Sequence, residues 1–297
     1  MITILGTTAT GKTRLAVKVA RSMNGEIISA DSRQVYRRMD IGSGKDLSEY
    51  GTGSNAVAYH LIDIVEPGTE FNIFDYQHAF LDAYNDILNR NKRAVFCGGS
   101  GMYLDSVINR YRLVKVERDS ALRVIMEKES DEQLAVRLKQ LKPLHNTTDI
   151  TDRERLYRAI EIAMHSVNAS PDEGIFPEIQ TVIFGLRTER EILKKRISRR
   201  LNERMENGMA EEIEGLLNSG LTAEQLEFYG LEYRFVTQYV TGILGRDEMI
   251  EILGKAIYQF ARRQIKWFRR MERKGTEIHW LNAEEDNLEN ILRFVGI

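Results

Sequence analysis

The chain has 297 residues, a net charge of −2 and a single cysteine, Cys97. This length allows one large or two modest domains. The near-neutral charge excludes binding of nucleic acid through an overall basic field, and a lone cysteine excludes an intrachain disulfide. The chain shows no signal pattern at its N-terminus and no apolar run long enough to cross a bilayer, so we expect a cytoplasmic protein that does not engage a membrane.

The first predicted elements are a strand over residues 2–5, a glycine-containing loop and a helix that begins near Arg14. The loop reads Gly6-Thr7-Thr8-Ala9-Thr10-Gly11-Lys12-Thr13, the pattern of a P-loop. Backbone N–H groups of such a loop, the helix N-terminus and the Lys12 ammonium bind phosphate oxygens, and the Thr13 hydroxyl is placed to hold Mg²⁺. The motif alone does not tell whether the phosphates are transferred, hydrolysed or expelled.

A second strand, predicted over residues 26–29, delivers Asp31 to the carboxyl edge of the sheet, where open α/β sheets bind ligands. From the sequence alone, Asp31 fits a helix N-cap and a catalytic role equally well. After a helix predicted over residues 74–89, the strand at residues 94–97 ends in Gly98-Gly99-Ser100-Gly101. It lacks the aspartate that usually supplies the second magnesium ligand in a P-loop NTPase. That absence favours Asp31 for the chemistry, and the glycines favour close approach of a ligand.

The region from 111 to 170 is highly charged and helical in pattern, without strand alternation, and is predicted to be a helical insertion domain. A strand over 181–186 then resumes the sheet, and helices from residue 189 onward complete the fold. We therefore predict the α/β class, with a P-loop NTPase-like parallel sheet flanked by helices. The predicted domains are 1–110, 111–170 and 171–297.

The last strongly patterned segment, residues 255–274, carries eight basic residues against one acid, Glu272. Its apolar residues recur at helical spacing, so one face packs and the other forms a positive stripe suited to phosphates. The packing face is predicted to contain Ile257, Phe260, Ala261, Ile265, Phe268 and Met271. Taken alone, such a charge run is more typical of a solvated helix.

Six segments in register resemble the motifs of the tRNA dimethylallyltransferases, also called tRNA isopentenyltransferases or IPP transferases. They are GTTATGKT (6–13), ISADSRQVYRRMDIG (28–42), HLIDI (60–64), GGSGMYL (98–104), DRERLYRAIE (152–161) and RRQIKWFRR (262–270). The resemblance implies transfer of a dimethylallyl group from dimethylallyl diphosphate to N6 of the adenine just 3′ of the anticodon (position 37), in tRNAs that read codons beginning with U. The implied partner is the anticodon stem-loop of tRNA, no ATP is consumed, Mg²⁺ is the expected cofactor, and we expect a monomer.

This reaction suits the predicted site, because a P-loop can stabilise a departing diphosphate and a carboxylate can accept the proton of the adenine amino group. Asp31 is the predicted general base. The register of the resemblance assigns Arg200, with Arg196 next, to the diphosphate, and places Ser100 near the reacting adenine. The implied tRNA contacts are Asp31, Ser32, Arg33, Gln34, Ser100, Arg123, Arg155, Arg158, Arg262, Arg263 and Gln264.

The chain also departs from the family pattern. The usual GTAKP is Gly42-Ser43-Gly44-Lys45-Asp46 here, and Tyr258 and Asn202 replace residues common in the family. Three other functions stay open: a P-loop kinase of a small metabolite, a prenyltransferase that acts on a free adenine nucleotide, and a non-catalytic RNA-binding module. The absence of a lid-type arginine loop weighs against the first, the basic stretches against the second, and the presence of Lys12, Thr13 and Asp31 against the third.

Overall fold

The computed structural model describes residues 1–141, 152–168 and 174–297, which divide into two compact units. The first unit comprises Met1–Asn109 and Ile179–Ile297, and the second comprises Arg110–Glu178. The predicted start of the insertion at residue 111 adjoins the start of the second unit. Its predicted end, between residues 170 and 171, lies outside the described residues.

The first unit is built on a parallel sheet whose described strands follow the order β3-β2-β4-β1-β5-β6. Central β1 pairs with β4 and β5, so that Ile4 lies opposite Cys97 on one side and Phe184 on the other. The four strands predicted from the sequence are confirmed as β1, β2, β4 and β5, and the α/β parallel fold is confirmed with them. The described strands are β1 (Ile2–Gly6), β2 (Gly25–Ala30), β3 (Tyr59–His60), β4 (Arg93–Gly98), β5 (Val182–Arg187) and β6 (His279–Asn282).

The two edge strands were not predicted. The expectation that only helices follow residue 189 is wrong, because β6 pairs in parallel with β5. Its four residues are half-buried or exposed, and its sequence, His-Trp-Leu-Asn, lacks the apolar run that marks a buried strand. The two residues of β3 are too short to give a periodic signal.

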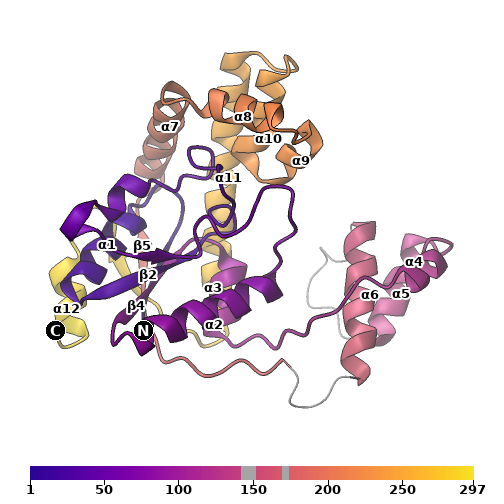
Figure 1. Ribbon diagram of the computed structural model, residues 1–297, viewed down its shortest axis with the longest axis horizontal. Helices are drawn as coiled ribbons and strands as arrows, with labels where there is room; N and C mark the ends of the chain where they lie inside the picture. Colours follow the sequence, from indigo (N-terminus) through magenta and orange to yellow (C-terminus); the bar gives the residue numbers. More distant parts are fainter. Residues whose placement is uncertain (142–151, 169–173) are drawn as a thin grey trace. The chain divides into compact units, whose positions relative to one another are not determined.

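Helices cover both faces of this sheet (Figure 1). On one face α1 (Lys12–Ser22) and α12 (Leu288–Phe294) lie side by side and share a core with alternate strand residues such as Ile4 and Phe184. On the other face α2 (Ile73–Asn89) packs against β4, where the Phe80 and Phe96 rings meet edge to face at 4.8 Å. Next to α2 lies α3 (Gly101–Ile108). Two 3₁₀ turns, Leu47–Tyr50 and Gly53–Asn55, lie between β2 and β3.

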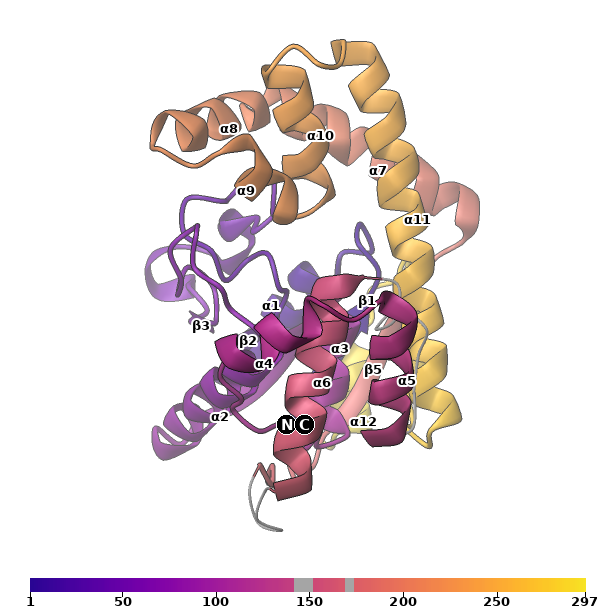
Figure 2. The same ribbon diagram turned by 90° about the vertical axis from the view of Figure 1, so that its right-hand side faces the viewer.

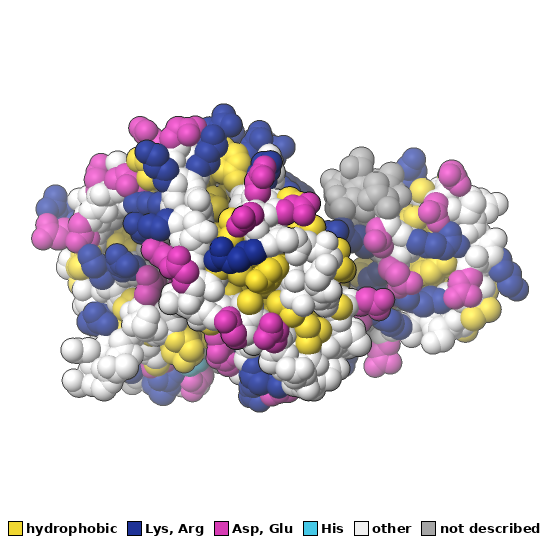
Figure 3. Space-filling view, turned by 90° about the horizontal axis from the view of Figure 1, so that it is seen from above, with side chains coloured by type: hydrophobic (Ala, Val, Ile, Leu, Met, Phe, Trp, Pro, Cys, Tyr) yellow, Lys and Arg dark blue, Asp and Glu magenta, His cyan; other side chains and the backbone are white. Residues whose placement is uncertain are grey.

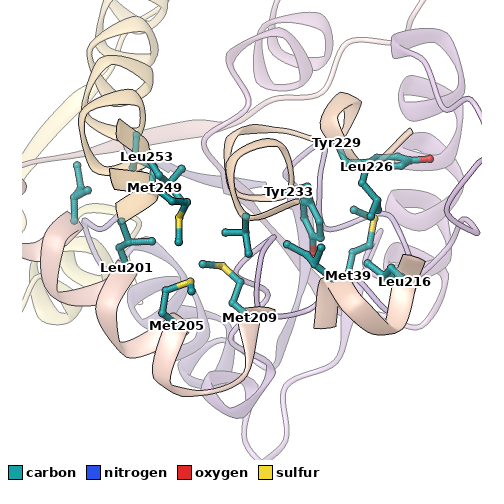
Figure 4. Packing of buried hydrophobic residues seen from close by; sticks show 14 of the residues in the cluster. Met39, Leu201, Met205, Met209, Leu216, Leu226, Tyr229, Tyr233, Met249 and Leu253 are labelled. Carbon is teal, nitrogen blue, oxygen red and sulfur yellow. The ribbon is translucent and has the colours of Figure 1, made fainter. Parts of the chain in front are cut away.

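A group of helices with its own core lies beyond the carboxyl edge of the sheet (Figure 2). Gly208, with a positive φ of 97°, separates the first two helices. Methionines, leucines and tyrosines from these helices, together with Met39 of the loop after β2, fill the core (Figure 4). The group consists of α7 (Arg190–Glu206), α8 (Met209–Asn218), α9 (Ala223–Phe228), α10 (Leu231–Val240) and α11 (Arg246–Arg273).

The second unit contains α4 (Ser120–Met126), α5 (Asp131–Leu141) and α6 (Arg153–Asn168). Its small core includes Leu134, Leu138 and Leu156, which are fully buried. No helix among the described residues is both long and apolar enough to cross a membrane. Basic and acidic side chains are intermixed over the face drawn in Figure 3, in keeping with the small net charge.

Candidate active site

The loop between β1 and α1 has the backbone that its P-loop sequence requires. Gly11 and Ala9 adopt positive φ angles of 77° and 61°. A Cβ on Gly6 would lie 2.9 Å from Thr10 Oγ1 and 3.2 Å from the Leu186 carbonyl oxygen, so a larger residue would not fit. The Thr10 hydroxyl donates a hydrogen bond of 2.8 Å to the Thr7 carbonyl. These contacts fix the backbone of the predicted phosphate-binding loop at the start of α1.

Lys12 and Thr13 lie in the first turn of α1, which begins two residues before the predicted start near Arg14. Lys12 Nζ lies 3.4 Å from the Thr7 carbonyl oxygen. Burial lowers the pKa of Lys12 and the nearby Arg200 lowers it further, whereas Asp31 and Asp46 oppose the shift. Lys12 is half-buried, and an ammonium that has lost part of its hydration favours an anionic ligand that would replace it.

The residues present fit Mg²⁺ held mainly by substrate and water. The described residues contain no group of three or more His, Cys, Asp or Glu that could hold a metal ion. Mg²⁺ commonly keeps several waters and binds through one or two protein ligands plus substrate phosphates. The half-buried Thr13 hydroxyl at the start of α1 is compatible with that arrangement.

Arg200 of α7 reaches the P-loop. Its Nη1 lies 3.4 Å from Thr8 Oγ1, and its Nη2 forms an ion pair with Asp46. Arg196, one turn earlier, forms an ion pair with Glu284, with 2.8 Å between Arg196 Nη2 and Glu284 Oε2. Glu284 lies just after β6. Of the two arginines predicted to bind diphosphate, Arg200 is the one that contacts the P-loop in this structure.

A small cavity beside the P-loop contains two charged residues that the sequence did not single out, Arg204 and Glu232. They lie 3.6 Å apart. Burial lowers the pKa of Arg204 and raises that of Glu232, and each charge opposes the other's shift. The four-residue spacing from Arg200 to Arg204 is a signal that could have identified the first, because it places both on one face of α7. The cavity is lined by Thr8, Ala9, Ile197, Arg200, Leu201, Arg204, Glu232 and Ile257.

The residues after β2 meet those after β4, as parallel strands with neighbouring carboxyl ends require. The Ser32 amide donates a 3.0 Å hydrogen bond to Ser100 Oγ. Asp31, directly after β2, accepts a 3.0 Å hydrogen bond from the Arg33 amide through Oδ1. This contact stabilises a turn rather than the N-terminus of a regular helix, and Asp31 remains half-buried. Asp31, Ser32 and Ser100 therefore lie together.

Gln34, predicted to contact tRNA, is buried inside the protein. Its Oε1 accepts a 2.9 Å hydrogen bond from Ser29 Oγ, and its Nε2 donates a 3.1 Å hydrogen bond to the Gly44 carbonyl. The side chain thus joins β2 to the loop that follows. Arg33 is half-buried and packs against Gly230, at the start of α10.

The glycine turn after β4 is approached by protein side chains, not left open for a ligand. A Cβ on Gly99 would lie 2.5 Å from Gln264 Nε2, and one on Gly101 would lie 2.4 Å from Trp267 Cγ. Gln264 accepts a 3.0 Å hydrogen bond from the Thr8 amide and donates a 2.8 Å hydrogen bond to the Gly99 carbonyl. Gln264, predicted to contact tRNA, bridges the P-loop and the glycine turn through its side-chain amide.

The amphipathic character predicted for residues 255–274 is confirmed in α11. Ile257, Ala261, Phe268 and Met271 are buried, but Phe260 is 38% exposed and Gln264 occupies the packed face in its place. Arg262 and Arg263, two predicted tRNA contacts, are exposed on the opposite face of α11. They are therefore free of the core and available to solvent.

In the second unit the predicted tRNA-binding arginines have different surroundings. Arg123 donates a 2.7 Å hydrogen bond to buried Glu161 and a 2.8 Å hydrogen bond to Glu154. Arg158 lies 3.3 Å from Glu161 and also donates to the Val116 carbonyl. Arg155 is exposed. Two of the three arginines thus balance a buried carboxylate within their own unit, and Arg155 points to solvent.

Cys97 is not a nucleophile in this structure. It is buried in β4, and burial raises the pKa of its thiol to about 12. The thiol therefore stays protonated near neutral pH.

Comparisons with known proteins agree with this geometry. The family model described as IPP transferase matches residues 34–271, and the one described as Isopentenyl transferase matches residues 1–63. The chain is 54% identical to tRNA dimethylallyltransferase 1 of Geotalea uraniireducens, over 100% of this chain and 98% of that protein. It is 52% identical to tRNA dimethylallyltransferase 2 of Syntrophotalea carbinolica, over 99% and 97% respectively.

Solved structures share the fold. The full-length tRNA isopentenylpyrophosphate transferase of Bacillus halodurans matches with a TM-score of 0.70 and 28% identity, over 99% of this chain and 95% of that one. A eukaryotic dimethylallyltransferase acting on tRNA matches with a TM-score of 0.77 over 100% of this chain and 78% of that one. At 22% identity, that second match supports the fold alone.

Proposed function

Because this chain belongs to the IPP transferase family and is therefore a prenyltransferase that modifies tRNA, we propose that its acceptor is N6 of the adenine on the 3′ side of the anticodon. The proposed donor is dimethylallyl diphosphate, and the tRNAs are those that read codons beginning with U. The products are N6-dimethylallyladenosine and diphosphate.

The observation that carries this proposal is the meeting of two half-sites at one edge of the sheet. The P-loop, with Lys12 and Arg200, offers cationic and amide donors for a leaving diphosphate. Asp31 and Ser100 lie on the neighbouring strand ends and offer a base and a hydroxyl. Asp31 is also near enough to Lys12 to oppose the shift in its pKa.

The proposed step breaks the bond between the allylic carbon and the diphosphate oxygen and forms a bond from that carbon to N6. Negative charge develops on the diphosphate, where Lys12, the P-loop amides and Arg200 stabilise it. Mg²⁺, when held by Thr13 and the phosphates, would neutralise part of the same charge. Asp31 accepts the N6 proton, because the lone pair of an aromatic amine is too delocalised for an efficient attack without a base.

An adenine in an anticodon loop is stacked and must leave the stack to reach these groups. We propose that exposed Arg262, Arg263 and Arg155 bind the tRNA backbone while the base enters. Arg33 and Ser32, beside Asp31, are the proposed contacts to the reacting nucleotide. The exposed basic residues favour tRNA over a free nucleotide, which would need none of them.

The experiment is an incubation with Mg²⁺, labelled dimethylallyl diphosphate and either unmodified tRNA or AMP. Label in tRNA, mapped by nuclease digestion to the adenine beside the anticodon, is the expected result. A tRNA in which that adenine is replaced by guanine is the matched control and should remain unlabelled. Label at another nucleotide, or in AMP alone, would overturn the proposed acceptor.

A further inference from the structure

The loop between β2 and the first 3₁₀ turn places a carboxylate, that of Asp46, against Arg200. Asp46 has φ 46° and ψ 48°, a left-handed conformation that few residues other than Gly, Asn and Asp adopt readily. Its Oδ2 forms the ion pair with Arg200 Nη2. The Arg200 guanidinium therefore lies between Asp46 and Thr8 of the P-loop.

The loop that presents Asp46 is anchored on two sides. Glu212 of α8 accepts hydrogen bonds of 2.8, 2.6 and 3.1 Å from the amides of Asp40, Ile41 and Gly42. Lys45, whose side chain is 1% exposed, donates a 2.8 Å hydrogen bond to the Tyr36 carbonyl. With its neighbours held in this way, the carboxylate of Asp46 has a defined position opposite Arg200.

The charges around Arg200 show why a carboxylate is useful there. Arg200 interacts unfavourably with both Lys12 and Arg204, since its charge lowers the pKa of each. Asp46 opposes both of these shifts. It therefore supplies negative charge to a cationic cluster before any phosphate is bound.

We propose that Asp46 is a positioning residue that acts through Arg200 and competes with diphosphate for it. In the free enzyme Asp46 holds Arg200 at the edge of the P-loop. When diphosphate binds, its oxygens replace Asp46 as the ion-pair partner of the Arg200 guanidinium. When the product diphosphate leaves, the ion pair between Asp46 and Arg200 forms again. The assignment rests on the proposed function, because it requires diphosphate in the P-loop.

Competition of this kind weakens diphosphate binding and speeds its release. A bound diphosphate must share the Arg200 guanidinium with the Asp46 carboxylate. Competition between two anions for one guanidinium near the protein surface is enough to change affinity severalfold. Asp46 should therefore affect the ligand-release step more than the chemical step.

The test is calorimetric titration of the purified enzyme with pyrophosphate in the presence of Mg²⁺, for wild type and Asp46→Asn. Asparagine accepts the left-handed backbone and keeps the shape of the side chain, so the fold should be retained. We expect Asp46→Asn to bind pyrophosphate about three- to tenfold more tightly. The rate of a single turnover should be nearly unchanged, and kcat under multiple turnover should fall as release slows.

Two further variants separate this role from a general loss of charge or structure. In an Arg200→Gln background, the Asp46→Asn change should have little effect on pyrophosphate affinity, because the residue through which it acts is gone. Asp286→Asn removes a carboxylate from an exposed pair with Lys18, 2.9 Å away, and should leave the affinity unchanged.

Equal or weaker pyrophosphate binding by Asp46→Asn would overturn the assignment, as would an equal gain in the Arg200→Gln background. If wild type itself failed to bind pyrophosphate, both this assignment and the proposed diphosphate site would be wrong. Binding by wild type without a gain in the variant would overturn only the role of Asp46.

Discussion

At the scale of single residues, the carboxylate of Asp31 has one observed contact and one proposed role, that of general base. Its Oδ1 accepts a hydrogen bond from the Arg33 amide, which fixes the turn after β2. An asparagine could accept the same bond but could not take a proton from an adenine amino group. Substitution by asparagine therefore removes the base while preserving the turn.

For Asp31→Asn we expect kcat to fall by about 10²- to 10⁴-fold, the usual contribution of a general base, with little change in the Kd for tRNA. Turnover is measured by label transfer and tRNA affinity by filter binding. Asp86→Asn, a change in an exposed ion pair on α2, is the control and should keep full activity. Turnover by Asp31→Asn within threefold of wild type would contradict the assignment of the base.

Which site residues can be predicted depends on whether their role is local. The P-loop could be identified because its Gly, Lys and Thr spacing is fixed over eight consecutive residues. The internal hydrogen bonds of Gln264 and Gln34 could not be predicted, because their partners are brought together only by the fold. Asp46 meets Arg200 only in the folded protein, whereas Arg204 lies one turn from Arg200 on the same helix.

At the scale of secondary-structure elements, the close approach of β2 and β4 depends on Gly98. It lies opposite Ala30 in the parallel register, and a Cβ there would be 2.2 Å from the Ala30 carbonyl oxygen. Backbone atoms cannot move aside as a flexible side chain can. The two strands that present Asp31 and Ser100 can therefore approach this closely only with glycine at position 98.

We expect Gly98→Ala to lower the free energy of unfolding by about 2–4 kcal/mol, measured by urea denaturation. Gly215→Ala is the matched control, because a Cβ at Gly215 in α8 meets no atom within 4 Å. Alanine is the better helix former, so this control should gain up to about 1 kcal/mol. Equal stability of the two variants would show that the strands can shift to accommodate a methyl group.

The buried carboxylate of Glu26 on β2 makes the stability of the fold depend on pH. Arg90, with help from His60 and Lys92, holds the pKa of Glu26 at about 2 despite its burial. A lowered pKa in the folded state means that the stabilisation is present above the unfolded pKa, near 4.5, and is lost as pH falls toward 2.

We therefore expect the stability difference between wild type and Glu26→Gln to be constant above about pH 5 and to shrink between pH 4.5 and about 2. Chemical denaturation at a series of pH values measures it. Glu66→Gln, which alters an exposed pair with Arg37, serves as the control and should show a smaller pH-dependent difference. A difference for Glu26→Gln that does not change with pH would contradict the lowered pKa.

The predictability of elements follows their length and burial. The apolar runs of β1, β4 and β5 are buried on both faces and were recognisable, whereas β3 and β6 are short edge strands with exposed positions. Such edge strands are defined by their pairing with a neighbouring strand. The spacing of apolar residues along the sequence does not reveal that pairing.

At the scale of the whole molecule, the second unit folds around its own core and carries arginines with distinct roles. Arg155 is exposed, whereas Arg123 pairs with buried Glu161. Reversal of charge at Arg155 should therefore test RNA binding, and loss of Arg123 should test the stability of this unit, because an unpaired buried carboxylate is costly.

We expect Arg155→Glu to weaken tRNA binding and to reduce the slope of log Kd against log salt concentration by about 1, without a change in thermal stability. Arg123→Gln should instead lower the melting temperature. Filter binding between 50 and 200 mM salt measures the salt dependence of tRNA binding, and calorimetry measures the melting temperature of each variant. An unaltered salt slope for Arg155→Glu would exclude a phosphate contact at that position.

The position of β1 between β4 and β5 has a consequence for how the chain folds as it is synthesised. One neighbour, β4, is present by Gly98, but the other, β5, ends at Arg187, after the entire second unit has been translated. Until then one edge of β1 has no strand partner, and an unpaired strand edge invites wrong pairing. On the ribosome, the second unit can complete its own local helical core first, and β5 then pairs with the open edge of β1 beside the P-loop.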